Sequence, residues 1–366
     1  MSDYLAGAVF AEGQVAPIHF GDPVTEQFEY EAGRALHPRG PVGLVTVTGA
    51  DRLTWLTTLS SQDLAPLGED GSSEMLLLDP NGRIQFAMGV VSQGDTVWLL
   101  TDPEPAPELA AFLESMKFMS RVEIRDRSAD YQVFETAGGA SPAGAEATWV
   151  DPWPGPSLGG ARYFQGSHPG ETFQHRLMIV PADRAAQFVA DSGLGLAGSL
   201  AAEATRVAAW RPGWTSEVDD RTMPAELDWL RTAVHVSKGC YCGQESVARI
   251  LNLGKPPRRL TFLQLDGSLS SIPAPGDQVE LNGRPVGVIT SVARHAEMGP
   301  IALALLKRSV DPAAPLTIGP IAAAQELIVP VKGKSDHSPS ERPGAGLRRL
   351  DHGGRDIRTT GPGTVR

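Results

Sequence analysis

The residues best suited to chemistry lie together in one short stretch, 238–245, which reads KGCYCGQE. Lys238 stands two residues before the thiol of Cys240, and a nearby ammonium group stabilises a thiolate and lowers its pKa when the thiol is partly exposed. The two bracketing glycines allow backbone N–H groups to approach a ligand closely. From the residues alone, this loop is either a reactive-cysteine site or a tight surface turn with incidental thiols.

Cys240 and Cys242 are the only cysteines of the chain, and one residue separates them. A disulfide between such close neighbours would be strained, and no disulfide framework suggests export. The eight histidines do not pair with the cysteines at familiar metal spacings, and structural zinc normally takes four such ligands. We therefore expect no metal site complete within this chain, although two thiolates could contribute to a metal or cluster shared with a partner.

Composition and charge restrict the class of protein. The chain has 366 residues, of which 41% are hydrophobic and 20% charged, with 40 Gly and 30 Pro. These values predict a globular protein of two or three domains with many turns and short strands. The formal net charge of −11 argues against a nucleic-acid partner. A local basic run, Lys238 to Arg259 with one acid at Glu245, could still bind an anionic ligand.

The chain also lacks the patterns of membrane and exported proteins. No apolar run approaches the roughly 20 residues that a membrane span requires. The first residues lack the basic and apolar regions of a signal peptide. We expect a cytoplasmic protein without a membrane partner.

The first 135 residues alternate strand and helix signals. Residues 42–48 are rich in β-branched residues and predict a strand, after which Asp51 can cap a helix. Segments 75–78 and 83–91 flank Asn81-Gly82, which predicts a tight hairpin. A strand at 96–101 and a helix at 109–116 follow, and 121–125 and 131–134 predict two short strands.

The remaining elements change in type along the chain. A strand at 175–180 precedes helices at 183–191 and from Ser199 to about Pro212. The G-x-G-x-x-G run that begins at Gly193 follows a helix rather than a strand, so helix capping explains it better than a dinucleotide site. Segments 260–265, 279–281, 285–292 and 301–306 predict only strands, with a hairpin at Asn282-Gly283, and indicate a small barrel or sandwich.

These signals divide the chain into five parts. They are an N-terminal α+β part at 1–135, a linker or insertion at 136–165, a second α+β part at 166–255 that ends in the KGCYCGQE loop, a β-barrel at 256–330, and a disordered tail at 331–366.

The KGCYCGQE run resembles the signature of the YgfZ branch of the GcvT-like folate-binding proteins, and residues 246–249 continue it in the family manner. Segment 48–51 with Trp55-Leu56 resembles the T-G-x-D helix start of the GcvT fold. Segment 78–84 resembles the central hairpin of that fold, and 287–291 with 302–304 its C-terminal barrel. The resemblance covers about residues 18 to 310.

This resemblance implies an α+β fold of two α+β parts around a central cleft, with a small antiparallel β-barrel at the C-terminal end. It further implies tetrahydrofolate in the cleft and iron-sulfur enzymes or assembly factors as partners. In the family, the residue that corresponds to Cys240 is essential, and Lys238 would assist it. The residues expected at the folate are Lys238, Tyr241, Gln244, Glu245 and Arg249, and Trp210 and Trp214 could line the cleft.

At two places the sequence departs from the pattern of the aminomethyltransferase for which the wider fold is named, and both departures argue against transferase activity. The aminomethyltransferase has catalytic aspartates directly after the hairpin, where this chain has Gln85-Phe86, and an acid in a later helix, where it has Ala208 or Ala209. Neither an amide nor a phenyl ring can replace a carboxylate in proton transfer. The resemblance therefore favours a role in the maturation or repair of iron-sulfur enzymes and leaves catalysis open.

Two alternatives remain. One is a folate-dependent one-carbon transferase that uses an acid such as Asp79, Glu217 or Asp219. The other is a redox or metal-relay protein built on the C-x-C pair.

Overall fold

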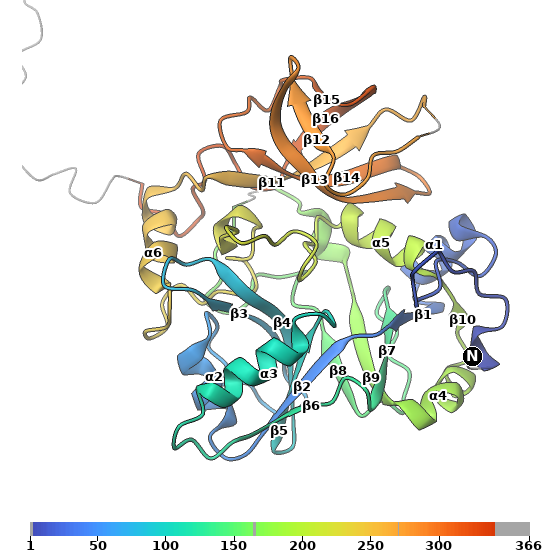
Figure 1. Cartoon of the computed structure of the whole chain (residues 1–366), viewed down its shortest axis with the longest axis vertical. Coiled ribbons are helices and arrows are strands. Elements are labelled where there is room, and N and C mark those ends of the chain that lie inside the picture. Colours follow the sequence, from blue (N-terminus) through green and yellow to red (C-terminus); the bar gives the residue numbers. More distant parts are fainter. Residues whose placement is uncertain (1–2, 164–165, 270, 341–366) are drawn as a thin grey trace, which may run out of the picture.

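The computed structural model describes residues 3–163, 166–269 and 271–340 (Figure 1). The predicted tail is therefore described only as far as residue 340, and 341–366 lie outside the described residues. Within this part of the chain, no helix is long and apolar enough to cross a membrane. The described residues include short 3-10 helices at Asp3–Leu5, Pro169–Thr172, Ala182–Arg184 and Pro224–Glu226.

The first sheet is antiparallel, with the strand order β3-β4-β5-β2-β6. Its strands are β2 (Gly43–Thr48), β3 (Ser72–Leu78), β4 (Ile84–Gln93), β5 (Thr96–Thr101) and β6 (Glu123–Asp126). Helices α2 (Arg52–Leu59) and α3 (Ala106–Ser115) contribute Leu56, Leu109 and Leu113 to a buried cluster that also contains Val45, Met75 and Leu99 of the sheet. The predicted strand–helix alternation of this region is confirmed.

Two local expectations in this region need correction. Asp51 occupies the N-cap position of α2 but makes no side-chain capping bond, because its carboxylate binds the backbone and guanidinium of Arg121 instead. The β3–β4 hairpin forms as predicted, but Leu78 pairs with Ile84, which makes the connection longer than a two-residue turn. Of Asn81 and Gly82, only Gly82 has a positive φ, and Asp79 accepts the backbone N–H groups of Asn81 and Arg83.

The second sheet has the strand order β10-β1-β7-β9-β8 and takes its strands from widely separated parts of the chain. They are β1 (Ala35–Gly40), β7 (Tyr131–Thr136), β8 (Ala147–Val150), β9 (Arg176–Pro181) and β10 (Gly195–Leu196). Only the pairing of β1 with β10 is parallel among these described strands. Segment 136–165, expected as a linker or insertion, contains β8.

Helices α1 (Pro23–Glu31), α4 (Ala185–Ser192) and α5 (Ser199–Ala208) accompany the second sheet. The chain leaves α4 through Gly193 in the left-handed conformation, so the glycine run is a helix cap, as predicted. Helix α5 ends at Ala208, before the expected Pro212, and Trp210 then adopts a φ of 58°.

The C-terminal part is a closed antiparallel barrel with the order β11-β14-β13-β12-β15-β16. Its strands are β11 (Arg258–Leu265), β12 (Gln278–Leu281), β13 (Arg284–His295), β14 (Gly299–Lys307), β15 (Leu316–Ile318) and β16 (Ile321–Leu327). Asn282 and Gly283 both have positive φ in the β12–β13 turn, as predicted. Strands β15 and β16 were not anticipated, and pairing of β16 with β11 closes the barrel.

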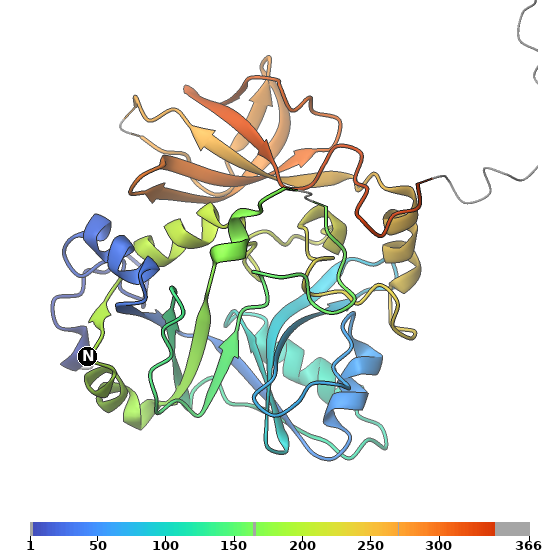
Figure 2. The same ribbon diagram turned by 180° about the vertical axis from the view of Figure 1, so that it is seen from behind.

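The parts share one core. Figures 1 and 2 show the barrel above the two sheets, with α5 between the barrel and the second sheet. A continuous buried cluster joins Leu76 of β3, Ile179 of β9 and Phe262 of β11. Helix α6 (Gln244–Leu253) leads from the KGCYCGQE loop to the barrel.

Segment 331–340, the described part of the predicted tail, packs back onto the body. Asp336 accepts the backbone N–H of Arg162, and Ser338 donates to the carbonyl of Leu251 in α6.

Candidate functional site

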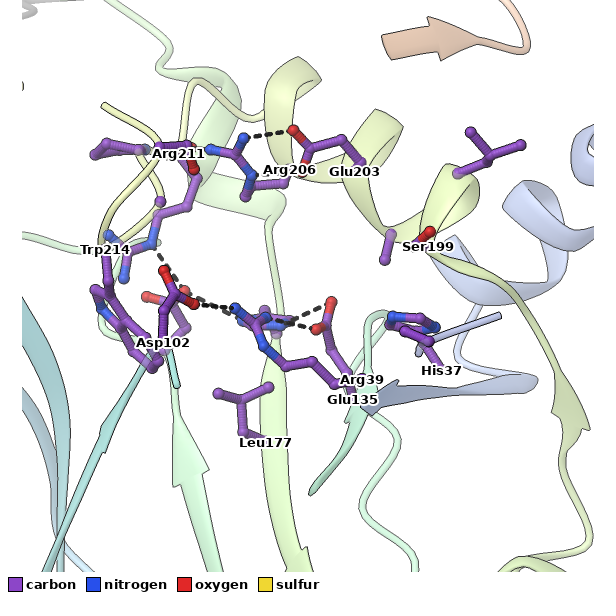
Figure 3. Close-up of a pocket in the computed structure, with 18 of the residues that line it drawn as sticks. His37, Arg39, Asp102, Glu135, Leu177, Ser199, Glu203, Arg206, Arg211 and Trp214 are labelled. Carbon is purple, nitrogen blue, oxygen red and sulfur yellow. Dashed lines mark hydrogen bonds and ion pairs between the residues drawn. The ribbon is translucent and has the colours of Figure 1, made fainter. Parts of the chain in front are cut away.

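A cavity of about 470 Å³ opens among the second sheet, α5 and the segment after α5 (Figure 3). Its wall includes Arg39 of β1, Glu135 of β7 and Leu177 of β9, and Glu203 and Arg206 of α5. The first sheet contributes Asp102, which directly follows β5. The volume lies in the range of pockets that bind small molecules.

Five side chains form the inner wall as a row of alternating charge. His175 Nε2 lies 3.2 Å from Glu135 Oε1, and its Nδ1 lies 3.2 Å from Asp151 Oδ2. Arg39 Nη1 donates to the other oxygen of Glu135 at 2.8 Å, and Arg211 Nε donates to Asp151 at 2.9 Å. Each carboxylate therefore binds one arginine and the imidazole ring of His175.

Both ends of this row reach the first sheet. Arg211 Nη2 donates to Glu74 Oε1 of β3 at 2.6 Å, and Arg39 Nη2 lies 3.6 Å from Asp102 Oδ1. The carboxylate of Glu74 also accepts hydrogen bonds from Trp214 Nε1 at 3.1 Å and from the hydroxyl of Thr232 at 2.7 Å. Seven ionisable residues thus form one connected row, which begins and ends at the first sheet and crosses the second α+β part between these ends. We call it the ion row, and in order it consists of Asp102, Arg39, Glu135, His175, Asp151, Arg211 and Glu74.

The pKa shifts follow from burial and from these neighbours. Burial alone would lower the pKa of His175, but the carboxylates of Glu135 and Asp151 outweigh it and raise the pKa above its usual value. Burial would raise the pKa of Glu135, yet His175 and Arg39 hold it well below its usual range. For Glu74, burial prevails over Arg211, so its pKa is raised.

The members of the ion row differ in how far they face the cavity. The side chains of Arg39 and Asp102 are 28% and 22% exposed, whereas His175, Asp151 and Arg211 are buried. The ring of Trp214 lies under the Arg39 guanidinium, 5.7 Å from its centroid, and the ring of Phe173 stacks on His175. Glu203, which also lines the cavity, is 38% exposed. The cavity therefore has aromatic rings in its wall and offers the guanidinium of Arg39 and the carboxylates of Asp102 and Glu203 to a ligand.

The KGCYCGQE loop lies outside this lining. None of residues 238–249 is among the described residues that line the cavity. The loop packs on the β3–β4 hairpin, where Gly243 approaches the carbonyl of Asp79 and the backbone of Gly82. Cys240 and Cys242 are both exposed and free.

Lys238 binds backbone carbonyl groups of the first α+β part. Its ammonium group donates to the carbonyls of Thr57 and Ser60 at the end of α2, and it lies 4.8 Å from the ring centroid of Tyr241. Burial lowers the pKa of Lys238 to about 8, although Asp63 opposes the shift. No hydrogen bond between Lys238 and either thiol is found in the described part of the chain.

The other expected ligand residues have different surroundings. Gln244 is half-buried in the first turn of α6, whereas Glu245 and Arg249 are exposed on that helix. Trp214 lines the cavity, but Trp210 is buried, with its ring 6.2 Å from that of Phe262 in the barrel.

The acids considered for a transferase are engaged in structural contacts. Asp79 caps the β3–β4 connection, and Asp219 forms an ion pair with Arg258. Glu217 is buried and accepts hydrogen bonds from Ser291 and from the backbone of Gly213.

Gln85 and Phe86, which stand where the aminomethyltransferase has its catalytic aspartates, do not line the cavity. Gln85 is exposed, and Phe86 is buried beneath α3, where its ring lies 5.9 Å from that of Phe112.

Sequence reasoning missed the ion row as a site. One signal was present, because His37, Arg39 and Glu135 are polar residues inside segments that form strands, and buried polar residues need partners. The partners come from distant parts of the chain, so the sequence did not show which residues would meet.

Comparison with known proteins agrees with this architecture. No family model matches the chain. An iron-sulfur cluster assembly factor IBA57 homolog, mitochondrial, from Mycosarcoma maydis is 28% identical over 239 residues, which are 60% of this chain but only 55% of that protein. The tRNA-modifying protein YgfZ of Escherichia coli is 24% identical over 74% of this chain and 84% of its own length.

An aminomethyltransferase supplies the structural match. The glycine cleavage system aminomethyltransferase T from Bartonella henselae has a TM-score of 0.70 and 17% identity, and the match covers 90% of this chain and 96% of that one. At this identity the likeness shows the fold. Together, the fold and the named relatives show that the chain is similar to YgfZ-type proteins of the GcvT-like superfamily.

Proposed function

We propose that this chain is a folate-binding protein that supports the maturation or repair of iron-sulfur enzymes, with Cys240 as its functional thiol. The cavity is the observation that carries the folate part. The flat pterin ring of a folate can stack on Trp214, and its edge of N–H donors suits the carboxylate of Asp102. The pterin carbonyl oxygen and the glutamate tail of the folate need donors such as Arg39. A relative named as an iron-sulfur cluster assembly factor supports the cellular role.

Calorimetric titration with tetrahydrofolate tests the ligand and its location. The wild type should bind, and Trp214→Ala should weaken binding by roughly tenfold or more because stacking is lost. Arg249→Ala changes an exposed residue outside the cavity and is the matched control. Absence of binding to the wild type would reject folate as ligand, whereas a loss confined to Arg249→Ala would move the site to α6.

The two exposed thiols provide a matched pair for the cellular role. In cells that lack the protein, Cys242→Ala should restore the activity of iron-sulfur enzymes as the wild type does, and Cys240→Ala should not. Full restoration by Cys240→Ala would remove the proposed role of that thiol. Loss with both variants would favour the redox or metal-relay alternative, in which the pair acts together.

A folate-dependent transferase remains the second candidate, because one observation favours it. The fold places the partly exposed carboxylate of Asp102 in the cavity, although the acids of the aminomethyltransferase motif are replaced. Transfer of a methyl or aminomethyl carbon to tetrahydrofolate by the purified wild type, and its loss in Asp102→Asn, would establish this activity.

A further inference from the structure

His175 has an arrangement that determines its protonation state. Each ring nitrogen faces a carboxylate oxygen at 3.2 Å, from Glu135 of β7 on one side and from Asp151 after β8 on the other. A carboxylate accepts hydrogen bonds, so both contacts are satisfied only when both ring nitrogens carry a proton. Glu135 and Asp151 also each accept a charged N–H from an arginine, which keeps them ionised.

Aromatic rings pack against His175. Phe173 stacks on one face of the ring and the edge of Trp149 approaches it. Besides the ion row, two titratable groups face this wall. Tyr30 of α1 donates its hydroxyl to Glu135 Oε1 at 2.6 Å, and burial together with Glu135 raises the pKa of Tyr30 well above its usual value. His37 of β1 is the second group. Burial lowers the pKa of His37, so it is neutral, and its Nδ1 lies 3.1 Å from the carbonyl of Ala197. The remaining charges near His175, Arg39 and Arg211, are both bound to the same two carboxylates.

The imidazolium therefore connects the two halves of the ion row. Without the second proton, Glu135 or Asp151 would face a ring lone pair instead of an N–H donor, although Tyr30 and the arginines remain bound to them. A buried carboxylate that faces a lone pair is destabilised, so the row separates between Glu135 and Asp151, and the side chains rearrange or admit water. This change affects Arg39 most. Among the described residues, Glu135 is the hydrogen-bond partner of Arg39 at 2.8 Å, whereas Asp102 lies farther away at 3.6 Å.

We propose that His175 is a positioning residue for ligand binding: as an imidazolium it holds Glu135 and Asp151 and thereby fixes Arg39 at the cavity wall, where the guanidinium donates to an acceptor oxygen of the ligand. The inference rests on the proposed folate function for the choice of ligand only. The fixed Arg39 geometry is a property of the protein itself.

Ring carbon NMR of histidine-labelled protein tests the first step. The His175 signal, identified by its loss in His175→Gln, should titrate with a pKa above the usual 6.5. Asp151→Asn keeps the side-chain size but removes one carboxylate, so it should lower the pKa of His175. A His175 ring that is already neutral at pH 6 would overturn the proposal.

Tetrahydrofolate binding measured against pH tests the second step. The dissociation constant of the wild type should stay level below the His175 pKa and rise about tenfold for each pH unit above it, because only the imidazolium form is competent. The His175→Gln variant should bind tetrahydrofolate weakly, and its dissociation constant should change with pH only as the ligand itself titrates. In Asp151→Asn, the rise of the dissociation constant should begin at a lower pH than in the wild type. His235→Gln, a substitution outside the cavity, should keep the wild-type profile.

A tetrahydropterin without the glutamate tail separates two sources of the acceptor oxygen. The same pH dependence with this compound assigns Arg39 to the pterin carbonyl, and pH dependence only with tetrahydrofolate assigns it to the tail carboxylate. A wild-type profile that does not follow the His175 titration with either compound would overturn the proposal.

A readout without ligand separates this proposal from the folate function. If the wild type binds no tetrahydrofolate at any pH, the folate function fails, but nitrogen relaxation at Arg39 Nε still tests the positioning role. The Arg39 side chain should be rigid below the His175 pKa and mobile above it, and mobile throughout in His175→Gln. Rigidity that does not change across that pH range would refute the role of His175.

Discussion

At the scale of single residues, Asp228 is a buried carboxyl group that lowers the free energy of unfolding at neutral pH. Its side chain is 1% exposed, and neither oxygen has a hydrogen-bond partner among the described residues. Burial raises its pKa to about 8, although Arg231 opposes the shift. Because an unfolded Asp ionises near pH 4, the native state holds an extra proton between about pH 4 and pH 8, and the free energy of unfolding falls as the pH rises across that window.

Asp228→Asn should therefore stabilise the protein at neutral pH. The amide needs no proton and tolerates the positive φ of 61° at this position. We expect the free energy of unfolding to increase at pH 7 by on the order of a few kcal/mol, and the difference from wild type to shrink toward pH 4. Urea denaturation at both pH values measures this, with the exposed Asp220→Asn as control. An equal gain at both pH values would contradict the assigned cause.

At the scale of elements, the KGCYCGQE loop is positioned by close backbone contact with the β3–β4 hairpin. Gly243 has a φ of 78°, and a Cβ there would lie 2.5 Å from the carbonyl oxygen of Asp79 and 2.8 Å from Gly82 Cα. These neighbours are backbone atoms, which cannot rotate away as a side chain can. The N-terminal end of α6, and with it the position of Cys240, depends on this contact.

Gly243→Ala should consequently separate the loop from the hairpin. We expect a loss of about 1–3 kcal/mol in the free energy of unfolding, from the positive φ and the steric overlap together. Gly239→Ala is the matched control in the same loop, because it has open space around its Cβ and no positive φ. Denaturant unfolding of both variants measures the difference, and equal stability of the two would show that the loop does not depend on this packing.

At the scale of the whole molecule, polar and apolar contacts join the barrel to the α+β parts. Ser291 of β13 accepts from Arg206 of α5 at 2.6 Å and donates to Glu217 at 2.5 Å, and all three side chains lie at this junction. The buried cluster that includes Phe262 continues from the barrel into both sheets. We therefore expect the barrel and the two sheets to unfold together.

Ser291→Ala tests this coupling. It leaves a buried carboxylate oxygen and a guanidinium N–H without their hydroxyl partner, which should lower the free energy of unfolding by about 1–3 kcal/mol. The midpoint of one cooperative transition should shift in denaturant unfolding, and the exposed Ser271→Ala should leave it unchanged. A separate, earlier transition of the barrel alone would argue against a shared core.

The sequence by itself determined the local features of this protein. Runs of β-branched residues and turn residues predicted most strands, and Asn282-Gly283 makes its turn because both residues tolerate positive φ. The KGCYCGQE run indicated the superfamily, and the Gln85-Phe86 pair showed that its usual acids are missing. These inferences depend on residues close together in the chain, which is why they could be drawn without a structure.

Only the tertiary structure decided where the ligand cavity lies and what lines it. Arg39, Glu135 and His175 meet on adjacent strands β1 and β7 and beside β9, although up to about a hundred residues separate neighbours along the chain. Strand pairing across such distances follows from burial of the whole sheet rather than from any local pattern. The same folding placed Lys238 against α2 and left Cys240 and Cys242 exposed outside the cavity, a separation that the compact motif did not reveal.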